Sequence, residues 1–347
     1  MSRLPALARG VLPSLAVPRV AVVGAGAAGL AAARRISDSG VAVSVFDKAR
    51  GVGGRLATRR VGKARIDHGA QFFTTRSPSF DALTRLWVSR EVAYEWCRGF
   101  AGAPDGHPRY AGREGMTALA KDLAAGLDVF TSSRVSKIVE HPDGWLVESE
   151  PGTFGPFDAV ILNPPAPQSA DLLSGASVDR DALDELTALR YEPAMAALVA
   201  LPGPASLPSP GGLKIDDGPV SWVADNQAKG VSAVPALTVH GRGDWSAAMW
   251  DRPDAEVLAV MLDSVEPYLG GITSRELLGP GASEAATVEL QRWRYATPLL
   301  SHERRCLMLA DTSRPVVAAG DAFGEAKVEG AVLSGWAAAD EVLRRLL

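Results

Sequence analysis

Residues 20–55 constrain the fold more than any other part of the chain. The apolar run Val20–Val23 has the length of a strand and leads directly into Gly24-Ala-Gly26-Ala-Ala-Gly29, a G-x-G-x-x-G pattern. The spacing predicts a helix over Ala27–Asp38 and a second strand over Val41–Val45, followed by Asp47. A strand, a glycine-rich turn, a helix and a strand that leads to an acidic residue are typical of a βαβ unit that binds a dinucleotide.

Each glycine of this pattern has a separate role. Gly24 allows the tight turn, Gly26 lets the backbone approach a pyrophosphate, and Gly29 lets the helix pack against the strand. The helix start, with Ala27 and Ala28, supplies amide donors and partial positive charge. Asp47 lies 18 residues after Gly29, next to Lys48, at the spacing of the carboxylate that hydrogen-bonds a ribose. A carboxylate there disfavours a nucleotide with a 2′-phosphate, so FAD and NAD remain.

A second glycine cluster favours FAD. Arg50-Gly-Val-Gly53-Gly54-Arg55 follows Asp47 almost at once, so the chain can wrap the same dinucleotide. The planar guanidinium of Arg55 is suited to clamp a pyrophosphate with two parallel hydrogen bonds. The motif resembles the G-G-R element of the FAD-binding amine oxidase superfamily.

Composition indicates a globular protein with small-molecule partners. The 347 residues exceed the usual size of a single core, so we expect two domains. The net charge is −4 and no long run of like charge occurs, so we expect no nucleic-acid partner. Cys97 and Cys306 fit neither a disulfide framework nor a metal site, which favours a reducing, cytoplasmic location. We expect residues 1–18 to be a disordered extension, a weak organelle-targeting peptide or a misassigned start, and we expect no membrane span.

The remaining pattern predicts the order of elements. We expect a helix over 77–100, a loop over 101–108, a short helix over 115–126 and strands over 129–139, 145–148 and 157–162. The run Asn163-Pro-Pro-Ala-Pro167 breaks the chain where it could leave one domain for another. Further strands are predicted near 195–200, 220–223 and 237–240, with helices over 181–189 and 254–269. A strand over 316–319, Gly320-Asp321 and an amphipathic helix up to Leu346 end the chain.

Several further blocks resemble the renalase-like branch of the FAD-dependent amine oxidase superfamily. They are Asp67-His-Gly-Ala-Gln-Phe-Phe-Thr, Ser221-Trp-Val-Ala-Asp-Asn226, Thr238-Val-His240, Arg292-Trp-Arg-Tyr-Ala296, Gly320-Asp-Ala-Phe and Val328-Glu-Gly-Ala. The chain departs from that pattern in its amino-terminal extension and in Lys229-Gly230, where relatives often have Lys-Pro-Gly.

The resemblance implies an α/β fold, in which a Rossmann-type FAD-binding domain is combined with a discontinuous α+β substrate domain. The predicted FAD-binding domain comprises 19–76, 109–168 and 296–347, and the predicted substrate domain comprises 77–108 and 169–295. The implied reaction oxidises 2- or 6-dihydronicotinamide dinucleotides by hydride transfer to a non-covalent FAD, with oxygen reduced to hydrogen peroxide.

The resemblance also suggests which residues form the site. Asp321 would hydrogen-bond the ribityl chain, and the last helix would direct its positive end at the flavin. The expected cofactor-binding residues are Gly24, Gly26, Ala27, Ala28, Gly29, Asp47, Lys48, Gly54, Arg55, Gln71, Phe72, Val135, Gly320, Asp321, Gly330 and Ala331. The catalytic candidates are Trp222, His240, Trp293 and Arg294, and no metal is expected.

Two other functions are compatible with the same motifs. One is an amine oxidase or desaturase of the superfamily, and the other is a nucleotide-binding relative without redox chemistry. A second G-x-G-x-x-G is absent from the sequence, so a nicotinamide would have to enter as substrate.

Overall fold

The structure is a computed structural model that describes residues 17–100, 105–280, 283 and 286–347. Residues 1–16 of the predicted extension and residues 101–104 of the predicted loop lie outside the described residues.

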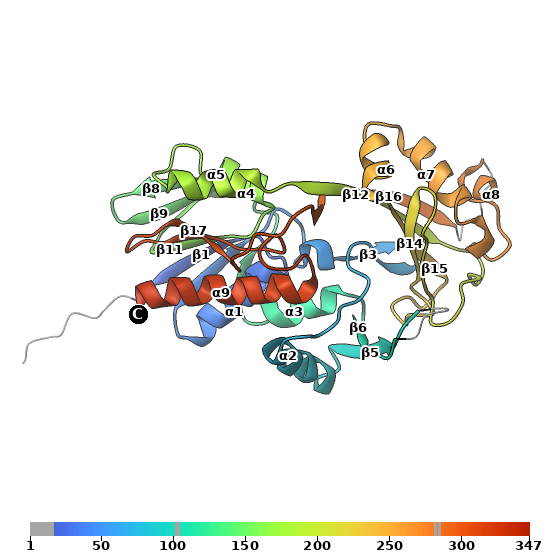
Figure 1. Ribbon diagram of the computed structural model, residues 1–347, viewed down its shortest axis with the longest axis horizontal. Helices are drawn as coiled ribbons and strands as arrows, with labels where there is room; N and C mark the ends of the chain where they lie inside the picture. Colours follow the sequence, from blue (N-terminus) through green and yellow to red (C-terminus); the bar gives the residue numbers. More distant parts are fainter. Residues whose placement is uncertain (1–16, 101–104, 281–282, 284–285) are drawn as a thin grey trace, which may run out of the picture.

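A six-stranded sheet forms the centre of the first part of the molecule (Figure 1). Its strands are β1 (Arg19–Val23), β2 (Ala42–Phe46), β7 (Asp128–Phe130), β11 (Ala159–Leu162), β17 (Leu307–Ala310) and β18 (Val316–Ala318). The spatial order is β17-β18-β11-β1-β2-β7, and all pairs are parallel except that of the edge strand β17. The central strands β1 and β11 are buried almost throughout, as their unbroken apolar runs predict for a parallel sheet covered on both faces.

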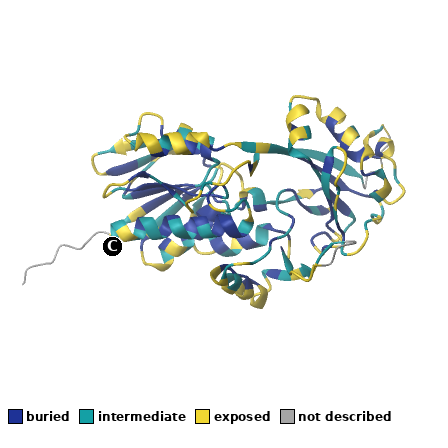
Figure 2. Cartoon of the chain, in the orientation of Figure 1, coloured by how far each residue is buried: buried dark blue, intermediate teal, exposed yellow. Residues whose placement is uncertain are grey.

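Helices cover one face of this sheet and a small sheet covers the other. Helices α1 (Ala27–Asp38), α3 (Thr117–Ala124) and α9 (Val328–Leu346) share a core on the first face. Figure 2 shows buried residues along the sheet and along α1 and α9. The second face carries the antiparallel strands β8 (Val135–His141), β9 (Gly144–Ser149) and β10 (Gly152–Phe157), with helices α4 (Ala166–Leu172) and α5 (Arg180–Ala188).

A five-stranded antiparallel sheet forms the second part. It contains β12 (Tyr191–Ala200), β13 (Gly212–Lys214), β14 (Val220–Asp225), β15 (Ala236–Gly241) and β16 (Thr287–Pro298) in the order β13-β14-β15-β12-β16. Helices α6 (Gly243–Ala248), α7 (Asp254–Asp263) and α8 (Ser274–Leu278) lie near one face, with the short helix η2 (Glu266–Tyr268). The long strands β12 and β16 connect the two parts (Figure 1).

The other face of the second sheet packs on a hairpin from the first part. This hairpin consists of β3 (Thr58–Val61) and β4 (Ala64–Asp67) and follows the short helix η1 (Gly54–Leu56). Its apolar side chains share a core with Ala196 and Leu198 of β12. The segment between the second glycine cluster and Gln71 is therefore held between the two parts.

The helix predicted over 77–100 is wrong in its second half. Helix α2 (Pro78–Ser89) begins after Ser77, whose hydroxyl caps Phe80 N, and ends at Arg90. Glu91 has φ 56°, which turns the chain, and β5 (Ala93–Cys97) then pairs with β6 (Arg109–Gly112). Aromatic side chains at alternate positions of β5 could have indicated a strand.

Two other predicted elements also differ. The strand predicted over 129–139 is two strands, β7 and β8, in different sheets, because the chain turns between them and hydrogen-bonds back to residues 47–49. The helix predicted over 254–269 ends at Asp263. By contrast, the predicted helix Ala27–Asp38 has the bounds observed for α1.

Candidate functional site

The two glycine clusters lie beside each other at the ends of β1 and β2. Gly53 N donates to Ala25 O at 2.8 Å, and Gly26 forms a parallel bridge with Gly53. A Cβ on Gly29 would come within 2.0 Å of Gly24 O, so only glycine allows this helix to start so close to the turn. The two predicted glycine clusters thus form one continuous backbone cradle, partly exposed at Gly24, Gly26 and Gly54. Ala27 and Ala28 form the first turn of α1, as predicted.

Asn163 is a further residue of this cradle that sequence reasoning missed. It follows β11, and its Nδ2 donates to Ala319 O at 3.0 Å. Its Oδ1 would lie 3.0 Å from a Cβ on Gly26 or Gly29. The sequence did contain an indication of this role, because a polar residue at the carboxyl end of a buried parallel strand lies at the edge of the sheet where ligands bind.

Asp47 lies where the sequence predicts, at the end of β2. Its carboxylate accepts hydrogen bonds from Ala25 N and Ala49 N, both at 2.7 Å, so it fixes the glycine turn. Lys48 is exposed and reaches Gln168 at 3.5 Å. Val135 begins β8 and is half-buried against the adjacent core.

Arg55 and Asp321 lie against each other. Two guanidinium nitrogens of Arg55 donate to the two carboxylate oxygens of Asp321, both at 2.6 Å, and one also donates to Ala296 O at 2.9 Å. The structure therefore places together the predicted pyrophosphate clamp and the predicted ribityl ligand. These bonds use three of the five N–H donors of Arg55, so Nε–H and one terminal N–H remain for a pyrophosphate.

The start of α9 lies on the same side of the six-stranded sheet as Asp321. Gly320 follows β18, and its N–H donates to Ser334 Oγ at 2.9 Å. Gly330 and Ala331 are buried in the first turn of α9, and a Cβ on Gly330 would come within 1.9 Å of Glu325 O. Gly54, with φ 53°, opens η1 next to Gly26.

A fully buried ion pair joins the two parts of the molecule. Lys229 Nζ lies 2.8 Å from Asp67 Oδ2, and both side chains are 0% exposed. Lys229 Nζ also donates to Gln71 O at 3.1 Å and to Gln71 Oε1 at 3.2 Å. Gln71 is thereby fixed in place. The sequence shows Lys229 only as part of a departure from a family motif, and gives no sign of this buried pair.

Aromatic side chains from both parts form one cluster. Phe72 contacts Trp96, Phe100 and Trp222, with ring centroids 6.1, 5.2 and 5.8 Å away. All four are only half-buried. Trp222 Nε1 is itself buried and has no hydrogen-bond partner among the described residues, so its donor is unsatisfied there.

Two histidines adjoin this cluster. Trp222 and His240 are direct cross-strand partners on β14 and β15. Trp293 stacks on His68 at 5.3 Å, and Trp293 Nε1 donates to His68 O at 2.9 Å. His68 Nδ1 is buried without a hydrogen-bond partner within the described ranges.

Both histidines are kept neutral. Burial lowers the pKa of His68 to about 4, with a further lowering by the Arg59 charge. Burial also lowers the pKa of His240 to about 4, against an opposing interaction with the His68 backbone. The aromatic region therefore presents neutral imidazoles at physiological pH.

Arg294 is not brought together with the other catalytic candidates. It is exposed and lies 4.8 Å above the Trp250 ring, close to the helices that cover the far face of the second sheet. Successive side chains of a strand point to opposite faces, so Trp293 and Arg294 cannot both face the first part. The two-residue period of a strand, read from the sequence alone, separates Arg294 from Trp293.

The residues fit a dinucleotide cofactor. Gly24 and Gly26 are partly exposed and carry no side chain that would keep a phosphate from the backbone. Within the described ranges there is no cluster of His, Cys, Asp and Glu suited to a metal ion. No helix in the described part of the chain is long and apolar enough to cross a membrane.

Comparisons with known proteins agree with this geometry. The sequence model of the flavin containing amine oxidoreductase family matches residues 86–343, and that of the NAD(P)-binding Rossmann-like domain matches residues 22–88. Among solved structures, a protein assigned as a protoporphyrinogen oxidase from Exiguobacterium sp. 255-15 is similar at 13% identity and TM-score 0.69, over 94% of this chain and 98% of that chain. Putrescine oxidase bound to putrescine is similar at 18% identity and TM-score 0.65, over 94% of this chain and 99% of that chain. At these identities the likeness to solved structures shows the fold.

Proposed function

Because this chain belongs to the flavin containing amine oxidoreductase family, an FAD-dependent group of oxidoreductases, we propose that it oxidises 2- or 6-dihydronicotinamide dinucleotides with oxygen as electron acceptor. The predicted fold class, a Rossmann-type domain combined with an α+β part, is confirmed. The renalase-like specificity is the proposed part.

The observation that carries the proposal is the half-buried aromatic cluster with its unpaired Trp222 Nε1. Flat walls from Phe72, Trp96, Phe100 and Trp222 suit a planar ring. The nicotinamide ring carries a carboxamide, whose carbonyl would accept from Trp222 Nε1.

The residues that would hold FAD are those of the cradle. Gly24, Gly26, Gly29 and Asp47 would bind the adenosine and pyrophosphate, and Arg55, Gln71 and Asp321 would bind the flavin half. When bound, FAD supplies an acceptor for a hydride and passes the electrons on to oxygen. The net reaction converts the dihydronicotinamide, oxygen and one proton into the pyridinium and hydrogen peroxide.

The protein's own part in this reaction is to orient the ring and exclude water. Loss of a hydride from a dihydropyridine requires no proton removal from the substrate, so neutral His68 and His240 are sufficient. Their neutrality also avoids repulsion of the pyridinium product.

Oxidation of an amine is the second candidate. The family description and the half-buried aromatic walls favour it, because such walls also attract a cationic amine.

Anaerobic stopped-flow reduction separates the two candidates. We expect 2- and 6-dihydronicotinamide dinucleotides to bleach the flavin absorbance quickly and ordinary 4-dihydro NADH to do so slowly. Readmitted air should restore the colour and yield peroxide. Rapid bleaching by amines, together with no response to the dihydronicotinamide isomers, would replace this proposal with amine oxidation.

The predicted domain division and location also remain proposals. The packing of α4 and α5 on the six-stranded sheet favours a boundary near Leu189 instead of residue 168. Cys97 and Cys306 are both free, which supports the proposed cytoplasmic location.

A further inference from the structure

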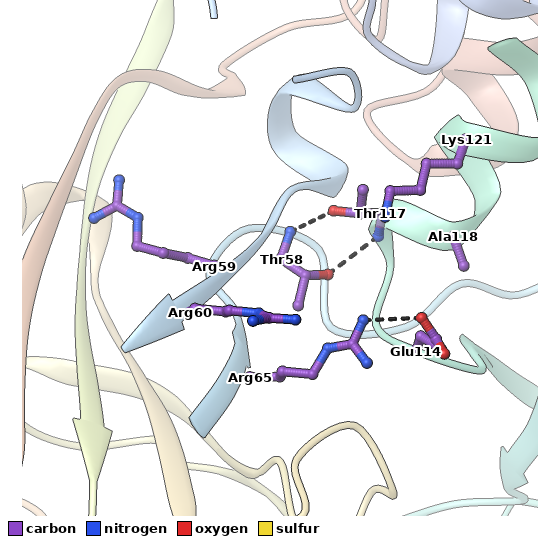
Figure 3. A pocket seen from close by; sticks show the side chains of 8 residues that line it. All are labelled: Thr58, Arg59, Arg60, Arg65, Glu114, Thr117, Ala118 and Lys121. Atoms are coloured by element: carbon purple, nitrogen blue, oxygen red, sulfur yellow. Dashed lines mark hydrogen bonds and ion pairs between the residues drawn. The ribbon is translucent and has the colours of Figure 1, made fainter. Parts of the chain in front are cut away.

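A cavity of about 180 Å³ lies between the β3–β4 hairpin and the start of α3 (Figure 3). Its wall carries four cationic side chains, Arg59, Arg60, Arg65 and Lys121, and one carboxylate, Glu114. The whole chain has a net charge of −4, so this concentration of positive charge is local.

Two of the four cations already have partners. Arg59 binds Glu289 Oε2 at 3.2 Å and Gln291 Oε1 at 2.7 Å, and Figure 3 shows it directed away from the other side chains. Arg65 binds Glu114 at 2.9 Å in a solvent-exposed pair. Exposed pairs of this kind contribute only about 0–1 kcal/mol, so Arg65 can exchange its partner for a ligand.

The other two cations are uncompensated. Within the described residues, the side chains of Arg60 and Lys121 make neither a hydrogen bond nor an ion pair, and both residues are exposed. Figure 3 shows Arg60 beside Arg65, with both side chains extended toward α3. Arg65 and, more weakly, Lys121 lower the pKa of Glu114, so the wall is electropositive even around its carboxylate.

We propose that this cavity binds the phosphate group of a small-molecule ligand, held by Arg60 and Arg65 with added charge from Lys121. Planar guanidinium forks match the oxygens of a phosphate better than an ammonium does. A volume of about 180 Å³ lies below the range of pockets that enclose a whole drug-sized ligand, so the cavity suits one charged group of a larger molecule.

An open surface region beside the cavity can take the rest of that molecule. It shares Glu114, Ala118 and Lys121 with the cavity and adds Glu91, Val92, Arg113 and Asp122. A small apolar surface beside carboxylates suits a sugar, whose hydroxyls donate hydrogen bonds. The ligand class is therefore a phosphorylated sugar or nucleotide. It is either a free phosphate ester or the phosphate of the dinucleotide substrate, and the second source rests on the proposed function.

Isothermal titration of the FAD-loaded protein with inorganic phosphate, at ionic strength held constant with sodium chloride, tests the cavity. We expect saturable binding that Arg60→Ala weakens about tenfold or more and that Arg60→Lys weakens less. Lys63→Ala is the matched control, since Lys63 is exposed on the same hairpin but does not line the cavity. Lack of saturable binding by wild type, or an equal loss in Lys63→Ala, would overturn the proposal.

Competition with NADP⁺ identifies the source of the phosphate. Displacement of phosphate by NADP⁺, with a raised KM and unchanged limiting rate of flavin reduction in Arg60→Ala, assigns the cavity to the substrate. Phosphate binding that NADP⁺ does not affect assigns it to a separate phosphate ester. Isothermal titration detects phosphate binding through its heat. The phosphate site is therefore tested even if no dihydronicotinamide reduces the flavin.

Discussion

Lys229→Met is expected to destabilise the folded protein by about 3–5 kcal/mol, because it leaves the Asp67 carboxylate buried without its cation. Methionine keeps the length and the apolar stem of the side chain but removes the charge. The substitution also removes two hydrogen bonds to Gln71, at 3.1 and 3.2 Å. Asp67 would keep its bonds from Thr58 Oγ1 at 2.5 Å and Met116 N at 2.8 Å, which do not neutralise it.

The expected change in Tm follows from the size of the protein. An unfolding entropy of about 2.1 cal/mol/K per residue gives roughly 0.7 kcal/mol/K for this chain. A loss of about 3–5 kcal/mol then lowers Tm by about 4–7 °C. Because Lys229 also fixes Gln71, FAD retention should fall in the same variant.

Thermal unfolding followed by circular dichroism measures this effect, with exposed Lys63→Met as control. The double variant Lys229→Met/Asp67→Asn removes both charges and should be more stable than Lys229→Met alone. A Tm within about 1 °C of wild type for Lys229→Met, or a double variant no more stable than the single one, would show that the buried pair does not hold the two parts together.

Three other changes test the site. Arg55→Ala should weaken FAD binding by about 1.5–3 kcal/mol, and by more than Arg55→Lys, since it also leaves Asp321 unpaired. Equal flavin occupancy of wild type and Arg55→Ala at limiting FAD would contradict this. His68 and His240 have folded pKa values of about 4, below the unfolded value of 6.5, so their contribution to stability should be lost as pH falls from about 6.5 to 4 and should be constant above pH 6.5. Tm measured over this pH range in wild type and in His68→Gln checks this. The same dependence of Tm on pH in both proteins would contradict it. Trp222→Phe should keep FAD but raise the KM for the dihydronicotinamide about tenfold through loss of one hydrogen bond; an unchanged KM in steady-state assays would remove Trp222 Nε1 from substrate recognition.

The local part of the fold could be predicted from the sequence. The βαβ unit from β1 to Asp47 was predicted with the observed bounds of α1, because its glycines, strands and acidic residue act within about thirty positions of each other. Where two neighbouring elements are separated only by a turn at a non-glycine residue, as at Glu91 and Ser132, no glycine or proline marks the turn, and one predicted element covers two observed ones.

The composition of the site was only partly predictable. Trp222, His240 and Trp293 were predicted from resemblance, and the structure brings them together with His68. Arg294 was grouped with them as a side chain that could hold a ribose or phosphate, and strand alternation places it elsewhere.

What the sequence by itself determined is the class of ligand, since a dinucleotide is bound mainly by backbone that a short motif exposes. The tertiary structure alone decided which charges meet. Lys229 pairs with Asp67, Arg55 pairs with Asp321, and Arg60 gathers with Arg65 and Lys121. The Lys229–Asp67 and Arg55–Asp321 pairs join segments far apart in the chain. A buried charge becomes a structural requirement only once the fold removes it from water.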